Sequence, residues 1–104
     1  MNGSPMSDLV PIKQWGLPIQ DFFLCAGPCS AESPAQLLAT AKGLRGCPVS
    51  LFRAGIWKPR THPGSFEGHG GKALTWLQRV KKETGLPVGV EVADVSHVHA
   101  CLKH

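Results

Sequence analysis

The chain is organised around residues 51–61, which read Leu51-Phe52-Arg53-Ala54-Gly55-Ile56-Trp57-Lys58-Pro59-Arg60-Thr61. An apolar, strand-like run carries Arg53 and passes into a loop with further cations, and arginine is rare in a hydrophobic strand unless it is paired. The loop offers an ammonium, a guanidinium and a hydroxyl group, which together suit an anion such as phosphate. The alternative is a solvated basic turn beside an arginine that reaches outward. Arg53 favours the anion site, because two groups of cations then meet at one strand end.

Three strand-like runs alternate with three helical patterns along the chain. The predicted strands cover 22–26, 49–55 and 88–92, and the predicted helices cover 34–44, about 71–84 and about 97–102. The first run is apolar throughout, which is typical of a strand buried on both faces of a parallel sheet. The regular alternation predicts a parallel α/β sheet built from successive right-handed units.

The helix ends have recognisable signals. Ser33 is expected to cap the first helix, with Gln36 completing a capping box. Gly85 suits the position just past the second helix, and Pro87 prevents its continuation. Ser96 is expected to cap the last helix.

The polar and charged residues collect in the loops that follow strands, at 27–33, 56–70 and 93–95. The loops that follow helices, at 45–48 and 85–87, are short and contain the glycine and proline residues that end the helices. In (β/α)₈ barrels, activity is found on the loops after the strands. This chain shows the same division, so its functional residues are expected at the carboxyl ends of the strands.

Composition limits the classes of function. The chain is 42% hydrophobic and 17% charged, and its net charge is 11 − 7 = +4 with histidine neutral. The basic residues are spread along the chain, which favours small anionic substrates over nucleic acid. No apolar run approaches the roughly 20 residues that span a membrane. No signal peptide precedes the four cysteines (Cys25, Cys29, Cys47 and Cys101), so we expect free thiols in a cytoplasmic protein.

Several motifs, taken in order, carry a family resemblance. They are Ala26-Gly27-Pro28-Cys29-Ser30, Glu32-Ser33, Phe52-Arg53-Ala54-Gly55, Lys58-Pro59-Arg60-Thr61, Glu83-Thr84-Gly85-Leu86-Pro87 and Glu91-Val92. Over about residues 22–102 the chain resembles the type I 3-deoxy-D-arabino-heptulosonate 7-phosphate (DAHP) synthases, and most closely their short bacterial branch. The pairing of Gly-Pro-Cys with Lys-Pro-Arg-Thr at this separation is specific, whereas either motif alone is weak.

The resemblance implies a fold and an activity. The fold is the amino-terminal portion of a (β/α)₈ TIM barrel, with about three β/α units. The activity is that of an aldol-type transferase that joins phosphoenolpyruvate to erythrose 4-phosphate and releases phosphate, the first step of the shikimate pathway to chorismate and the aromatic amino acids. A divalent metal (Mn, Fe, Co or Zn) activates the aldehyde. The full-length parent is implied to be a homo-oligomer, fused in some members to chorismate mutase.

The resemblance also implies roles for individual residues. Cys29 would be a thiolate ligand of the metal. Arg53 and Lys58 would hold phosphoenolpyruvate in the catalytic site, and Arg60 and Thr61 would hold the phosphate group of erythrose 4-phosphate.

The chain departs from the family in extent. It contains three strand–helix units where a complete barrel has eight, and the His, Glu and Asp metal ligands of the later strands are absent. We therefore expect a lead-in over 1–20 and a partial barrel domain over 21–104, with activity of the chain alone in question. Two alternatives remain: an enzyme like 3-deoxy-D-manno-octulosonate 8-phosphate (KDO8P) synthase, which uses a five-carbon sugar phosphate, or a non-catalytic phosphate-binding fragment that needs a partner chain.

Other candidate side chains favour packing or pairing over chemistry. Cys25, inside the first apolar run, is expected to be a small buried hydrophobic residue. Glu91 is expected to form an ion pair with Arg53 or Lys58, the alternative being a contact that tunes the metal site. His97 and His99 are two apart on a predicted helix, so they point to different sides and suit a metal poorly.

Overall fold

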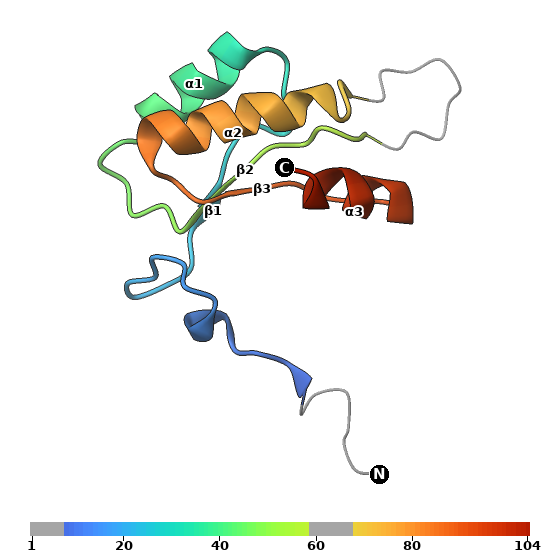
Figure 1. Cartoon of the computed structure of the whole chain (residues 1–104). Helices are drawn as coiled ribbons and strands as arrows, with labels where there is room; N and C mark the ends of the chain where they lie inside the picture. The colour runs from blue at the N-terminus through green and yellow to red at the C-terminus, as the bar shows by residue number, and fades with distance from the viewer. Residues whose placement is uncertain (1–7, 59–67) are drawn as a thin grey trace.

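The computed structural model describes residues 8–58 and 68–104, in which a short 3₁₀ helix precedes three strand–helix units (Figure 1). The elements are η2 (Ile12–Gln14), β1 (Cys25–Ala26), α1 (Pro34–Gly43), β2 (Leu51–Arg53), α2 (Lys72–Thr84), β3 (Val88–Gly89) and α3 (Val95–Leu102). All strand pairs are parallel, and the sheet order is β1-β2-β3. The prediction of a parallel α/β fold with about three units is confirmed. None of the helices in the described ranges is long and apolar enough to cross a membrane.

The sheet register separates two faces. Phe52 pairs with Ala26 on one side and with Val88 on the other, so these three residues form one row. Phe52 is fully buried, and this row faces α1 and α2, which lie together over one side of the sheet (Figure 1). Because successive residues of a strand point to opposite faces, Leu51 and Arg53 face away from these two helices.

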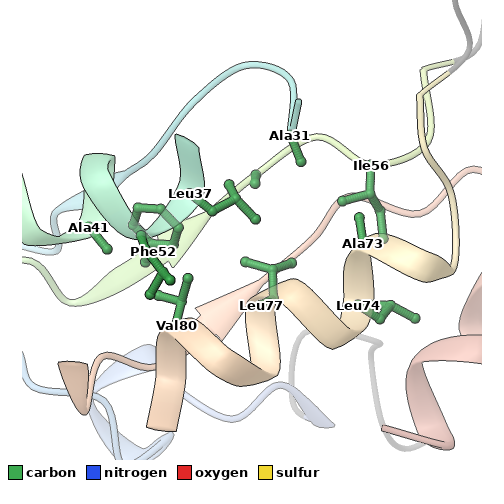
Figure 2. Close-up of a cluster of buried hydrophobic side chains, with 11 residues drawn as sticks. Ala31, Leu37, Ala41, Phe52, Ile56, Ala73, Leu74, Leu77 and Val80 are labelled. Atoms are coloured by element: carbon green, nitrogen blue, oxygen red, sulfur yellow. The ribbon is translucent and has the colours of Figure 1, made fainter. Parts of the chain in front are cut away.

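The hydrophobic core lies between the sheet and these two helices (Figure 2). Each helix contributes one apolar stripe, as its helical spacing predicts. The buried residues are Leu37, Leu38 and Ala41 from α1, Ala73, Leu74, Leu77 and Val80 from α2, Phe52, Ala54 and Ile56 from β2 and the segment after it, and Ala31 from the loop before α1. The carboxyl end of β2 is thereby held in place by packing on one face, which leaves the other face for polar side chains.

Local capping explains where α1 and α2 lie along the chain. Ser33 Oγ accepts a hydrogen bond from the N–H of Gln36 at 3.1 Å, and Pro34 occupies the first turn. The side chain of Gln36 accepts from the N–H of Glu32 at 2.9 Å, one residue before the position that a capping box uses. At the end of α2, Gly85 adopts a left-handed φ of 76°, and its N–H donates to the carbonyl of Lys81.

Two expectations for the strands are wrong. The paired residues are fewer than predicted, and Cys25 is exposed where a buried position was expected. Phe22, in the same apolar run, is also exposed. The physical reason is the register: Cys25 pairs with Leu51, so it belongs to the face opposite α1 and α2. An apolar run predicts burial on both faces, and the described residues place these two helices on only one.

The cap of α3 also differs from the prediction. Asp94, and not Ser96, is the N-cap, and its Oδ1 accepts the N–H of His97 at 3.2 Å. The hydroxyl of Ser96 donates to the same carboxylate. The carboxylate of Asp94 therefore caps the helix, and the helix begins two residues earlier than a cap at Ser96 would predict.

The cap predicts a pH dependence of stability. The hydrogen bonds from the Ser96 hydroxyl and from the backbone N–H of His97 lower the pKa of Asp94 below its ordinary value of 3.8. A carboxyl group whose pKa is lower in the folded state stabilises the fold above its unfolded pKa, and this contribution is lost as the pH falls. We expect the stability difference between wild type and Asp94→Asn to shrink as the pH falls below about 4, the ordinary pKa of an aspartate. Urea unfolding followed by circular dichroism measures it, and a difference independent of pH would contradict the role of the charge.

Candidate functional site

The segments that follow β1 and β2 approach each other closely at two glycines. Gly27 has a φ of 153°, and a Cβ there would lie 1.8 Å from the carbonyl oxygen of Arg53. A Cβ on Gly55 would lie 2.2 Å from the carbonyl oxygen of Cys29. The N–H of Ala31 donates to the carbonyl of Gly55 at 2.9 Å and holds the two segments together. Only residues without a side chain permit this approach.

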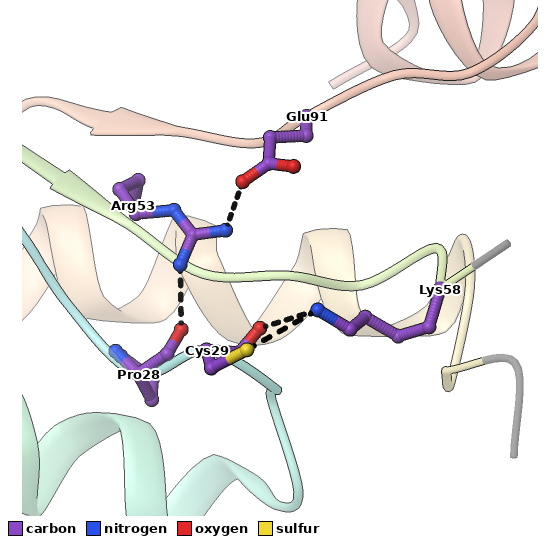
Figure 3. Close-up of polar contacts among 5 residues, drawn as sticks. All are labelled: Pro28, Cys29, Arg53, Lys58 and Glu91. Carbon is purple, nitrogen blue, oxygen red and sulfur yellow. Dashed lines mark hydrogen bonds and ion pairs between the residues drawn. The ribbon is translucent and has the colours of Figure 1, made fainter.

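Arg53 links this contact to the segment that follows β3 (Figure 3). One of its terminal nitrogens donates to the carbonyl of Pro28 at 3.1 Å, and the other forms an ion pair with Glu91. The side chain of Arg53 is 21% exposed and that of Glu91 is 74% exposed. Of the partners considered for Glu91, the structure therefore shows Arg53.

Lys58 reaches the same segment from the other side (Figure 3). Its Nζ lies 3.1 Å from the carbonyl oxygen of Cys29 and 3.4 Å from the Cys29 sulfur. Arg53 and Lys58 thus contact consecutive residues, Pro28 and Cys29. Within residues 8–58 and 68–104, no carboxylate lies in ion-pair range of Lys58. The arrangement leaves a positive charge next to an exposed thiol at the carboxyl end of β2.

Not every predicted site residue can be placed. Arg60 and Thr61 lie outside the described residues. Cys29 is exposed, and in the described part of the chain no three His, Cys, Asp or Glu side chains are grouped as a metal site would require. One thiol does not make a tetrahedral or octahedral centre, so the described residues by themselves do not fit a metal ion.

Two features of this region were missed by sequence reasoning. Trp57 stacks on His97 of α3, with ring centroids 4.0 Å apart and an interplanar angle of 7°. The Nδ1 atom of His97 accepts the N–H of Ala93 at 3.0 Å, which fixes the imidazole ring. In addition, Ser30 Oγ is buried without a hydrogen-bond partner in the described residues. The first contact joins residues 40 positions apart, and no local pattern could indicate it.

The fold and the site together indicate the class of protein to which the chain belongs. Successive parallel β/α units, with arginine and lysine gathered where the strands end, are the arrangement of (β/α)-barrel proteins that bind anions. The comparison with family models agrees: the model of the DAHP synthetase I family matches residues 19–104. The chain belongs to the DAHP synthetase I family.

Individual relatives agree with this assignment. A phospho-2-dehydro-3-deoxyheptonate aldolase from Thermotoga maritima is 41% identical over 70 residues, which are 67% of this chain and 21% of that protein. A 2-dehydro-3-deoxyphosphooctonate aldolase from Acidithiobacillus ferrooxidans is 37% identical over 86 residues, or 76% of this chain and 31% of the relative. A second protein of that name, from Vesicomyosocius okutanii, is 44% identical over 80 residues, or 70% of this chain and 29% of the relative.

A solved structure extends the similarity to three dimensions. The crystal structure of the DAHP synthase from Thermotoga maritima superposes with a TM-score of 0.67 at 33% sequence identity. The match covers 78% of this chain and 23% of that structure. The chain therefore spans about a fifth to a third of the length of the relatives that it matches.

The glycine contact generates a prediction. Gly27→Ala should destabilise the chain by more than about 1 kcal/mol, because the added methyl group collides with the backbone at Arg53 and the φ is unfavourable for alanine. Urea unfolding measures the loss. The matched control is Gly43→Ala, at a helical position where a Cβ would meet nothing within 4 Å. The control should be neutral or stabilising, and equal losses in both variants would contradict the interpretation.

Proposed function

We propose that this chain is the amino-terminal part of a DAHP synthase, the transferase that condenses phosphoenolpyruvate with erythrose 4-phosphate. The observation that carries the proposal is the meeting of Arg53 and Lys58 at Pro28 and Cys29, in a chain of the DAHP synthetase I family. Phosphoenolpyruvate bears a phosphate and a carboxylate, and cationic donors at a strand end are suited to hold both groups.

Each residue has a proposed role. Lys58, with no carboxylate neighbour among the described residues, supplies a positive charge to phosphoenolpyruvate. Arg53 orients the same substrate, because a guanidinium has more N–H donors than its bonds to Pro28 and Glu91 use. Arg60 and Thr61 bind the phosphate group of the sugar. Together these residues neutralise the repulsion between two anionic substrates and hold the reacting carbons together.

Metal dependence is part of the proposal. A divalent metal (Mn, Fe, Co or Zn) would polarise the aldehyde oxygen of erythrose 4-phosphate. Cys29 would supply one donor, and the other ligands would come from residues beyond those described here.

The second candidate is a KDO8P synthase. It is favoured by the relatives named 2-dehydro-3-deoxyphosphooctonate aldolase, whose identities to this chain, 37% and 44%, lie on either side of the 41% of the heptonate aldolase. The sequence at Pro59 argues for DAHP, because KDO8P synthases typically carry Asn before the Arg-Thr pair. A non-catalytic phosphate-binding fragment, completed by a partner chain, is the third candidate. Homo-oligomerisation and fusion to chorismate mutase are proposed only for a full-length parent.

A chimera tests the choice of substrate. Residues 19–104 would replace the matching region of the Thermotoga maritima DAHP synthase, with consumption of phosphoenolpyruvate as the measurement. We expect turnover with erythrose 4-phosphate and little with a five-carbon aldose phosphate. The opposite preference would support the KDO8P candidate. A folded chimera that is inactive with both sugars would support the non-catalytic one.

Variants of the active chimera test the individual roles. Arg60→Ala should raise the KM for erythrose 4-phosphate by about tenfold or more, the cost of one charge-assisted hydrogen bond, with little change for phosphoenolpyruvate. Arg53→Ala should do the reverse. Lys81→Ala, on the exposed side of α2, is the control and should change neither KM. If both arginine variants changed the two KM values equally, the assignment of Arg53 to phosphoenolpyruvate and of Arg60 to erythrose 4-phosphate would be wrong.

A further inference from the structure

The pair formed by Cys29 and Lys58 has a geometry that the proposed binding role does not require. The lysine Nζ lies 3.4 Å from the sulfur and is held there by the carbonyl oxygen of the same cysteine at 3.1 Å (Figure 3). Gly55 makes room for this arrangement, since a Cβ there would lie 3.0 Å from Nζ. The amine is therefore positioned against the thiol by two contacts that are independent of any ligand.

The other cysteines differ from Cys29. All four are free thiols, and Cys25, Cys29 and Cys47 are exposed. In the described part of the chain, Cys29 is the one cysteine whose sulfur has a hydrogen-bond partner, and this partner is a primary amine. An exposed thiol is open to peroxide, and the sulfenic acid that forms can condense with a backbone nitrogen to a sulfenamide. At Cys29 the nitrogen in contact with the sulfur is the Lys58 amine.

We propose that Cys29 and Lys58 are a redox modification site, at which a peroxide converts the pair into a reversible sulfur–nitrogen (sulfenamide) cross-link. In the first step the sulfur attacks hydrogen peroxide, the O–O bond breaks, and the products are Cys29 sulfenic acid and water. In the second step the Lys58 ammonium first gives up a proton to solvent, the lone pair of the resulting amine attacks the sulfur, an S–N bond forms, and the S–O bond breaks. The hydroxide leaves as water with one amine proton, so the chain loses two hydrogen atoms overall.

Proximity decides the fate of the sulfenic acid. An amine already in contact with the sulfur reacts as an intramolecular partner, at a high effective concentration. Without it, an exposed sulfenic acid is oxidised further to sulfinic acid, which is not reversed by thiols. The cross-link protects Cys29, and a thiol reductant restores both side chains.

The consequence for activity rests on the proposed function. If Lys58 holds phosphoenolpyruvate and Cys29 a metal, the cross-linked form has lost one cation and one ligand, and the site is switched off until it is reduced. The cross-link itself needs neither substrate nor metal. Its detection can therefore succeed or fail independently of the proposed activity.

Mass spectrometry of the chain tests the proposal. A variant with Cys25→Ser, Cys47→Ser and Cys101→Ser retains Cys29 alone, which excludes intramolecular disulfides. After treatment with hydrogen peroxide we expect the intact mass to fall by two hydrogen atoms, with tryptic peptides joined between Cys29 and Lys58. Dithiothreitol should restore the original mass.

Matched substitutions make the outcome decisive. In the same background, Lys58→Met and Lys58→Arg should lose the cross-link and accumulate sulfinic acid, a gain of two oxygen atoms. Lys42→Met, on exposed α1 surface, should keep the cross-link. Circular dichroism verifies that each variant is folded, and the arginine variant retains a positive charge if methionine is not tolerated. Sulfinic acid in the Lys58 chain, or an unchanged mass loss without Lys58, would overturn the proposal.

Discussion

The site depends on the close approach between the backbone after β1 and the backbone after β2. At Gly27 and Gly55 the two segments are nearer than any side chain would allow, and the hydrogen bond from Ala31 to Gly55 joins them. This contact places Pro28 and Cys29 under the cations of the next strand. Without it, Arg53 would lose its hydrogen bond to Pro28, and Lys58 would lose both of its contacts with Cys29.

The division of β2 between two faces is what makes a charged site compatible with a stable fold. Phe52 is buried beneath α1 and α2, while Arg53 points to the opposite side. The ion pair with Glu91 compensates Arg53, although a pair this exposed contributes only about 0–1 kcal/mol. Lys58 has no carboxylate neighbour in the described residues, so the positive potential is concentrated near Cys29.

Sequence reasoning succeeded where the determinants are local. The helix signals at Ser33 and Gly85 act within a few residues, and both were identified correctly. The position of Cys25 was wrong because burial of a strand depends on what covers each face, which the strand itself does not encode. Asp94 was missed as a cap because two neighbouring residues could serve equally well by spacing. The stacking of Trp57 on His97 depends on how the third unit docks against the second, a tertiary contact without a local signature.

The shortness of the strands has a consequence for self-association. Within the described residues, β1 and β3 each pair on one side only, so each presents an open edge. Long, flat open edges recruit strands of other molecules and lead to aggregation. Here each edge strand pairs over only two residues, and Gly89 further weakens β3 as a template for an incoming strand. A sheet so short at its edges offers an incoming strand few backbone groups with which to pair.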